Sequence, residues 1–192
     1  MMDKINPDNK LVTLEWALRN GVSFARIKDS VSSGELIKID RGLYAVPGTH
    51  IDDLFIIQHR YSKGIYSGLT ALSLNGLTEH ESMRIFMTFP KGYNPSSLKD
   101  DTWHIDVTRV IPELYGIGVR ECRTENGTVI RTYGPERTLC DCLRGKGISR
   151  YILNDAMRRY FSSDYADIDL LREYSVKLHV AQKIESYIQM ST

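Results

Sequence analysis

The stretch SFARIKDSVSSGELIKIDRGLYAVPG, residues 23–48, holds the pattern that decides the fold of the N-terminal part of the chain. Ser23 is a favourable N-cap, and Phe24, Ile27 and Val31 recur at the spacing of one helical face. We therefore expect a helix that buries these three side chains and ends at the Ser-Gly pair. Two β-prone runs around a polar, glycine-containing turn follow it, and this order predicts a β-hairpin.

Another helix is expected immediately before this stretch, over residues 9–19, followed by the turn Asn20-Gly21. Its apolar positions share one predicted helical face: Leu11, Leu14 and Leu18. Two helices joined by a tight turn with glycine are typical of a helix-turn-helix, and the hairpin after them extends the pattern to a winged helix-turn-helix. Pro47-Gly48 is a suitable end for such a unit, so we place a first domain at residues 1–48.

The second domain, residues 49–192, is expected to be larger and of mixed structure. Helices are expected at 51–61 and 67–75, and four short strands follow, at 83–89, 103–108, 118–123 and 128–133. Four helices then complete the chain, at 135–143, 149–161, 168–178 and 180–190. This order predicts an α+β protein whose N-terminal winged helix-turn-helix precedes a mixed domain with a mostly antiparallel sheet and a C-terminal helical layer.

The composition is that of an ordinary globular protein, with 42% hydrophobic and 26% charged residues. The net charge of +1 means that a nucleic-acid surface has to come from local clustering of Lys and Arg. Three cysteines cannot pair completely, and the sequence shows no signal peptide or long apolar run. We therefore expect a cytoplasmic protein without a role in membranes.

Polar and basic residues of the predicted helix-turn-helix and hairpin are candidates for DNA contact. Arg can donate two hydrogen bonds to guanine, while Lys, Ser and the N–H groups of a helix N-terminus can hold phosphates. A merely solvated face is the alternative for the helix taken alone. The candidate DNA-binding residues are Arg19, Ser23, Arg26, Lys28, Ser30, Ser33, Lys38 and Arg41.

A second basic stretch lies in the larger domain, between residues 123 and 150. It could extend a DNA surface, or its members could be solvated individually. Arg137 has a further alternative, which is an ion pair with a neighbouring carboxylate. The residues of this possible secondary basic surface are Arg123, Arg131, Arg137, Arg144, Lys146 and Arg150.

Several segments resemble the AbiEi-type antitoxin family. The N-terminal resemblance is carried by the helix-turn-helix pattern followed by IDRGLYAVPG at 39–48. The C-terminal resemblance is carried by YSGLTAL at 66–72, GLT at 76–78, TFP at 88–90 and YGPERTLCD at 133–141. These segments are spread over most of the chain.

The resemblance implies an antitoxin of a type IV toxin-antitoxin system, of the abortive-infection class that acts in phage defence. Such a protein is expected to repress its own operon by binding inverted repeats upstream of it through the winged helix. Basic residues of the C-terminal domain are expected to contribute to cooperative DNA contact by a protein that is otherwise a monomer. The antitoxin is also expected to oppose a nucleotidyltransferase-like toxin without forming a stable complex with it.

No enzyme signature is complete in the sequence. The five histidines fall at no metal-ligand spacing, the cysteines at 140 and 142 are one residue too close for a zinc knuckle, and neither a phosphate loop nor a nucleophile elbow is present. We therefore expect no catalytic residue, metal or cofactor. Three alternatives stay open: a metal-dependent DNA-processing enzyme that uses Asp106 and Glu121, a solitary winged-helix regulator, and a protein-interaction module.

Overall fold

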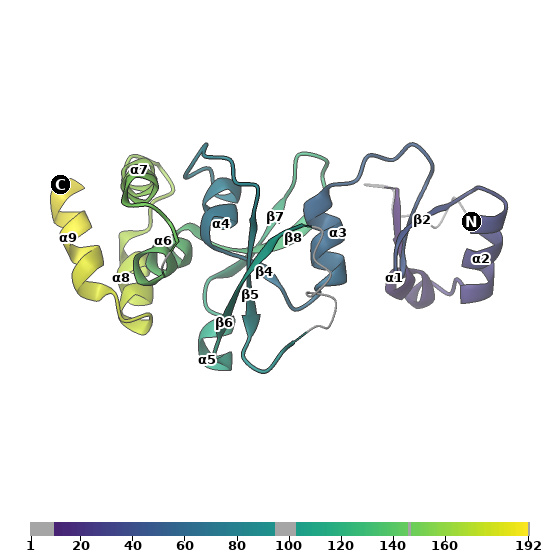
Figure 1. Cartoon of the computed structure of the whole chain (residues 1–192), viewed down its shortest axis with the longest axis horizontal. Coiled ribbons are helices and arrows are strands. Elements are labelled where there is room, and N and C mark those ends of the chain that lie inside the picture. Colours follow the sequence, from purple (N-terminus) through teal and green to yellow (C-terminus); the bar gives the residue numbers. More distant parts are fainter. Residues whose placement is uncertain (1–9, 95–102, 146, 192) are drawn as a thin grey trace. The chain divides into compact units, whose positions relative to one another are not determined.

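A computed structural model describes residues 10–94, 103–145 and 147–191. The fold is α+β, as expected, and each of its two compact units has a sheet and helices (Figure 1). Within the described ranges, no helix combines the length and the apolar character that crossing a bilayer requires. The two units are Met1–Ser62 with Arg123–Ile130, and Lys63–Cys122 with Arg131–Thr192.

The first unit holds a three-stranded sheet and, in its described part, the helices α1, α2 and α3, the last over Asp53–Arg60 (Figure 1). β1 (Leu11–Thr13) leads into α1 (Leu14–Arg19), α2 (Phe24–Ser32) follows, and β2 (Ile37–Asp40) and β3 (Leu43–Ala45) form a hairpin. β3 is the central strand and pairs antiparallel with both β1 and β2. The helix predicted after the serine cap and the hairpin predicted after that helix are therefore confirmed.

The helix predicted over residues 9–19 is wrong in its first half, and its first residue lies outside the described residues. Leu11 and Val12 form a strand instead, because they pair with β3 and are only 4% and 1% exposed. Thr13 then caps α1 through its side chain. Leu18, expected on the same buried helical face as Leu11, is 54% exposed. Pairing with β3 has overridden the helical spacing of the leucines.

The first unit extends beyond the predicted boundary at residue 48, and the carboxylate of Asp52 holds part of this extension together. The Asp52 carboxylate accepts hydrogen bonds from the hydroxyls of Thr124 and Thr128, at 2.5 and 2.8 Å. It also accepts one from the side-chain amide of Asn126, at 2.7 Å. Burial raises the pKa of Asp52, but the three hydrogen bonds outweigh this effect and hold the pKa below its ordinary value. Asp52 therefore ties the turn around Asn126 to the first unit.

We expect Asp52→Asn to lower the free energy of unfolding by about 1 to 3 kcal/mol at neutral pH, because the amide cannot accept all three hydrogen bonds. The folded pKa of Asp52 is lowered, so its stabilisation is fully present above the unfolded pKa and is lost as the pH falls through the folded pKa. Denaturant unfolding at neutral pH and in steps below about pH 4 measures both effects. Glu125 is an exposed carboxylate of the same turn. If Glu125→Gln lowers the free energy of unfolding as much as Asp52→Asn does, the hydrogen bonds of Asp52 are not the cause of the loss.

The second unit is built on a five-stranded sheet in the order β6-β5-β4-β8-β7. β4 pairs antiparallel with β5 but parallel with β8, and β5 pairs parallel with β6. The sheet is therefore mixed, and the prediction of a mostly antiparallel sheet is wrong. Its central strand β4 was missed because two residues are too few to show an alternating pattern. The strands are β4 (Ile65–Tyr66), β5 (Ile85–Pro90), β6 (Ile105–Val110), β7 (Val119–Arg123) and β8 (Val129–Tyr133).

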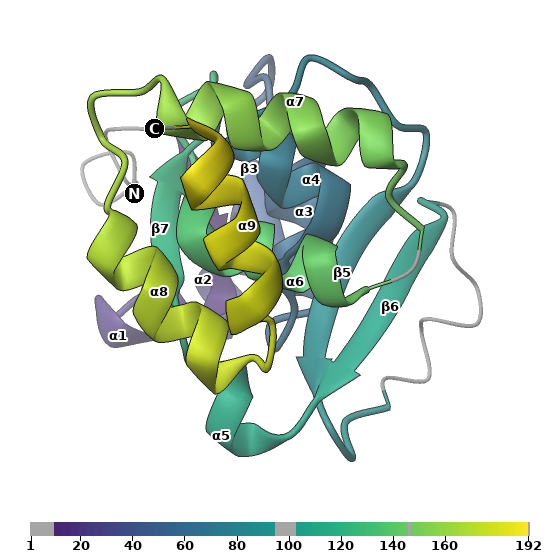
Figure 2. The ribbon, with the colours of Figure 1, turned by 90° about the vertical axis from the view of Figure 1, so that its left-hand side faces the viewer.

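Helices lie in two layers beside this sheet. α4 (Gly68–Leu74) and α6 (Pro135–Arg144) lie nearest the strands (Figure 1). α7 (Arg150–Phe161), α8 (Ile168–Lys177) and α9 (Ala181–Ser191) form the outer layer, which Figure 2 shows from the front. The apolar faces of both layers share one core. The four helices predicted at the C-terminal end of the chain are present, each within one residue of its expected ends.

Gly118, between α5 (Pro112–Tyr115) and β7, allows a close approach of the chain to α6. Its φ of +72° lies in the left-handed region, which favours glycine. A Cβ atom built on Gly118 would also lie 2.6 Å from the Cβ of Arg137, closer than two carbon atoms can pack. The segment therefore needs glycine at this position for two independent reasons.

We expect Gly118→Ala to lower the free energy of unfolding by about 2 to 4 kcal/mol, since it adds backbone strain to a steric clash. Gly116→Ala is a matched control, because Gly116 has a φ of −83° and no atom would lie within 4 Å of its added Cβ. Urea unfolding of the two variants measures the difference. Similar midpoints for both variants would show that the approach at Gly118 is not required.

Candidate nucleic-acid interface

α2 is held in the first unit by its cap and by one buried side chain. The Ser23 hydroxyl accepts a hydrogen bond from the backbone N–H of Arg26 at 3.2 Å, which fixes the start of the helix. Ile27 has no exposed surface. Because each helical residue advances by about 100°, the burial of Ile27 decides which residues of α2 face outward. The core around it also contains Val12, Ala17, Val22, Leu36 and Tyr44.

Arg26 and Lys28 are both exposed, and they lie on opposite flanks of α2. Each is an immediate neighbour of Ile27, so the two are rotated from it by about 100° in opposite directions. The line of α2 opposite Ile27 carries Ala25 and Asp29, each about 160° from it. α2 therefore presents a narrow strip between two basic side chains. Asp29 was not among the residues predicted to contact DNA, although its position two residues after Ile27 places it opposite the core.

Two side chains of α2 are not where the sequence pattern placed them. Phe24, expected in the core, is 45% exposed, and the Lys28 Nζ lies 4.9 Å from its ring centroid in a cation–π contact. Ser30, expected to face outward, is 1% exposed, and its hydroxyl donates to Glu35 at 2.9 Å. The chain turns back over the C-terminal half of α2, where the Leu36 N–H donates to the Ser30 carbonyl. The returning chain thus buries Ser30, while Phe24 at the N-terminal end of α2 stays partly exposed.

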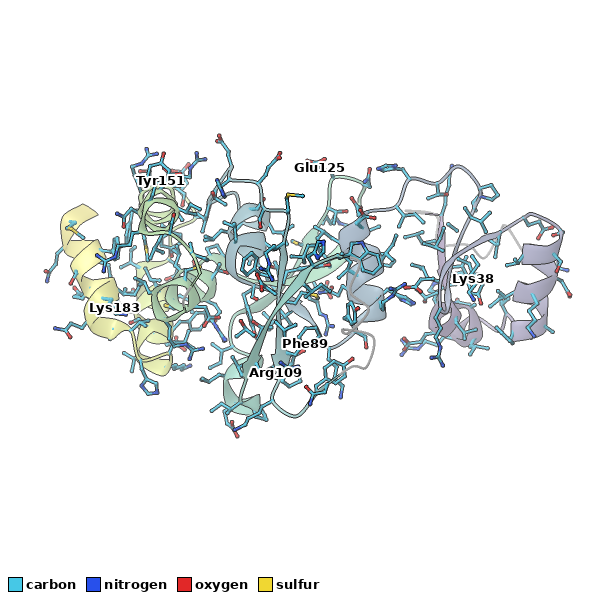
Figure 3. The ribbon with its side chains drawn as sticks, viewed as in Figure 1. Lys38, Phe89, Arg109, Glu125, Tyr151 and Lys183 are labelled. Carbon is cyan, nitrogen blue, oxygen red and sulfur yellow. The ribbon has the colours of Figure 1, made fainter. Side chains whose placement is uncertain are left out.

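Lys38 lies on the α2 side of the three-stranded sheet. It pairs directly with Tyr44 and follows Leu36 by two residues, and both of these are buried in the core that contains Ile27. Directly opposed residues of paired strands share a face, and so do alternate residues of one strand. The exposed side chain of Lys38, labelled in Figure 3, is therefore on the same face of the sheet as α2.

Arg41 lies at the end of β2 that is away from α2, in a turn that α3 (Asp53–Arg60) anchors. Asp40 accepts a hydrogen bond from the Arg60 Nε at 2.8 Å, and the His59 Nε2 contacts the Arg41 carbonyl oxygen at 3.2 Å. The hydrogen bond from Arg60 lowers the pKa of Asp40 below its ordinary value, although burial opposes it. The backbone of Arg41 is thus placed with α3, while its side chain is exposed.

The remaining candidates of the first unit are exposed and engaged in local contacts. Arg19 pairs with Glu15 at 2.6 Å, and the two side chains are 76% and 74% exposed. An ion pair this exposed contributes little to stability, so a phosphate can compete with Glu15 for Arg19. The Ser33 hydroxyl donates to the carbonyl of Ser30 at 3.2 Å.

Arg137, a candidate of the second basic stretch, has no exposed surface. Its Nη1 donates to the carbonyl oxygens of Leu114 and Ile117, at 2.6 and 2.8 Å. Its Nε donates to Asp141 at 2.8 Å, and its guanidinium carbon lies 4.3 Å from the ring centroid of Tyr133. A contact of Arg137 with DNA is therefore excluded in this fold. The alternative of an ion pair with a neighbouring carboxylate is confirmed.

The other members of this basic stretch come from different elements. Arg123 donates to a backbone carbonyl of its own turn at 3.2 Å. Arg131 is half-buried in β8, and Arg150 is the exposed first residue of α7. Arg144 pairs with Asp141, the carboxylate that also pairs with Arg137. Lys146 lies outside the described residues. A common DNA surface for these cations stays a prediction.

We expect Arg137→Gln to lower the free energy of unfolding by about 3 to 5 kcal/mol, because it leaves two carbonyls without their donor and removes the closer of the two guanidinium partners of Asp141. Arg150→Gln, on an exposed helix end, should change it by no more than about 0.5 kcal/mol. Chemical unfolding followed by circular dichroism compares the two. A stable Arg137→Gln protein that binds DNA more weakly than the wild type would restore a surface role for Arg137.

The metal-site alternative based on Asp106 and Glu121 does not fit the sheet. β6 carries Asp106 and β7 carries Glu121, and these are the two edge strands. Four strand spacings, about 19 Å, separate them, which is far beyond the reach of one metal ion. Asp106 instead pairs with Arg84 at 2.8 Å. Within the described ranges, no group of three or more His, Cys, Asp or Glu side chains is placed to hold a metal.

The three cysteines, Cys122, Cys140 and Cys142, are free thiols. Burial raises the pKa of each of them, to about 12 in the case of Cys140. All three thiols therefore stay protonated at neutral pH and lack nucleophilic character. Cys140 and Cys142 belong to the core of the second unit, where a thiol acts as a small apolar side chain.

Comparison with known proteins identifies the fold. No family model matches the chain, and no curated protein was found to match it. Among solved structures, the chain is similar to the RV2827C protein from Mycobacterium tuberculosis, with a TM-score of 0.58 and 16% sequence identity. The match covers 99% of this chain and 74% of that one. At this identity the likeness shows a shared architecture alone.

Proposed function

We propose that this chain is a DNA-binding repressor of its own operon and the antitoxin of a type IV toxin-antitoxin system. The first unit reads the operator through α2, and the second unit opposes a nucleotidyltransferase-like toxin. One observation carries the DNA-binding part: α2 presents Arg26 and Lys28 on the two flanks of a narrow outward strip that carries Ala25 and Asp29.

The order of elements in the first unit supports a winged helix-turn-helix. A strand, two short helices and an antiparallel hairpin follow one another, and the strand joins the hairpin in one sheet. In helix-turn-helix proteins the second helix lies in the major groove, with the residues of its N-terminal part at the base edges. Arg26 is the third residue of α2, and it lies in this part of the helix.

The side chains on this surface suit the chemistry of the groove. Arg26 can donate two hydrogen bonds to guanine, and Asp29 can accept one from the amino group of cytosine. The exposed side chains of Lys28 and Lys38 can neutralise phosphates beside the groove. Three cations against one carboxylate leave an excess of two positive charges on this surface. Binding by one molecule is therefore weak and sensitive to salt, and inverted repeats allow two molecules to cooperate.

The antitoxin part of the proposal is supported by the family resemblance of the second unit. The segments that carry it include 66–72, 88–90 and 133–141, which supply the end of β4 with the start of α4, the end of β5, and the end of β8 with the start of α6. The cytoplasmic location and the opposition to the toxin without a stable complex belong to this proposal.

We expect Arg26→Ala to weaken binding to the DNA upstream of the operon by about 1 to 3 kcal/mol, with relaxed preference at one base position. Lys28→Ala should weaken binding to all sequences alike and reduce the slope of log K against log salt by about 0.9. Fluorescence anisotropy at several salt concentrations measures both effects. Lys91→Ala, which removes an exposed lysine of the second unit, is the charge-matched control and should bind like the wild type.

Two outcomes of this titration would contradict the assignment of α2. One is the absence of DNA binding by the wild type at low salt, which favours the protein-interaction module. The other is a loss of DNA affinity in Lys91→Ala equal to that in Lys28→Ala. Any exposed lysine would then contribute to DNA binding as much as Lys28 does.

The two functions can be separated in the full chain. The double variant Arg26→Ala/Lys28→Ala should lose repression of an operon reporter and still protect growing cells from the neighbouring toxin. Both substitutions are at exposed positions, so the variant should stay folded. Loss of protection by a folded double variant would show that the antitoxin activity needs the DNA-binding surface.

A further inference from the structure

The second unit contains a partly enclosed cavity that neither proposed function uses. Its volume is 160 Å³, and its walls come from the start of α4, from β5 and β6, and from the end of α6. Segments distant in sequence thus meet around one space. The volume is below the roughly 300 Å³ at which sites for drug-sized ligands begin, so its occupant is a small molecule or part of one.

Two hydroxyl groups of largely buried residues line this cavity. Ser67 and Thr88 are 5% and 2% exposed, and neither hydroxyl makes a hydrogen bond within the described part of the chain. Ser67 is the N-cap residue of α4, yet its side chain accepts no capping hydrogen bond. Both hydroxyls therefore keep their donor and acceptor capacity for a molecule inside the cavity.

Asp141 and Arg144 are the charged side chains that line the cavity among the described residues. The Asp141 Oδ2 accepts from the Arg137 Nε at 2.8 Å, and its Oδ1 accepts from the Arg144 Nη2 at 3.3 Å. Arg137 does not line the cavity but pairs with Asp141, so this carboxylate only partly offsets the charge of Arg144. The Arg144 side chain is 35% exposed and makes only a long bond to Asp141, so most of its N–H donors stay available.

We propose that this cavity binds the oxyanion group of a small molecule, either a phosphate or a carboxylate. The guanidinium of Arg144 supplies charge-assisted hydrogen bonds to such a group. A cation is disfavoured because both oxygens of Asp141 are already engaged. Phe86 and Ile148 provide apolar wall for the carbon atoms next to the oxyanion. The hydroxyl donors are those of Ser67, Thr88 and Thr108.

This inference goes beyond repression and toxin opposition and does not rest on either of them. The residues that line the cavity all belong to the second unit, while α2 belongs to the first. Anion binding and DNA binding can therefore be lost separately.

Calorimetric titration and thermal unfolding of the full chain, with inorganic phosphate or acetate at an ionic strength held constant by chloride, test the proposal. The unfolding midpoint of the wild type should rise with phosphate or with acetate but not with chloride, and the active anion identifies the class of ligand. Thr88→Val keeps the shape of the side chain and removes its hydroxyl, and Arg144→Gln removes the charge. Each should raise the dissociation constant at least about tenfold. Ser73→Ala, at an exposed position of α4, should not change it.

The proposal is overturned if neither anion raises the midpoint of the wild type, because water then satisfies the hydroxyls. It is also overturned if the substituted proteins bind the anion as tightly as the wild type, which would place the anion elsewhere. Arg144 is exposed, so Arg144→Gln tests the site even where Thr88→Val fails to fold.

Discussion

The burial of Ile27 is the constraint on which the proposed DNA reader depends. This side chain has no exposed surface, and it fixes the rotation of α2 about its own axis. Arg26 and Lys28 then fall on the two flanks, and Asp29 falls on the outermost line. The hairpin adds to the same arrangement, because Lys38 shares a face of the sheet with residues that pack against Ile27. One apolar contact thus sets the positions of the charges that face solvent.

A buried arginine plays the corresponding part in the second unit. Arg137 is held by two carbonyl oxygens and by Asp141, and it connects α6 with the segment before β7. Gly118 makes this contact possible, since any Cβ there would collide with Arg137. Asp141 extends the cluster to the cavity of the second unit through Arg144. The same ionic cluster therefore supports the fold and sets the charge of the cavity.

Amphipathic spacing made the helices predictable, since the residues of α2 and of the four C-terminal helices follow a 3.6-residue period. The sheet was less predictable because pairing is not local. Leu11 and Val12 become a strand only through β3, and the direction of β4 and β5 relative to their neighbours leaves no local signal. In the candidate site, the exposure of Arg26 and Lys28 followed from the pattern, whereas the burial of Ser30 depends on where the chain after α2 returns.

The contact of α2 with operator DNA is tested most directly by following the backbone amide NMR shifts of the full 22.0 kDa chain during titration with that DNA. If α2 reads the operator, the largest shift changes fall in residues 23–33 and at Lys38, with small changes in the core residues of the second unit. Changes that leave residues 23–33 untouched and gather in the second unit would contradict this role of α2.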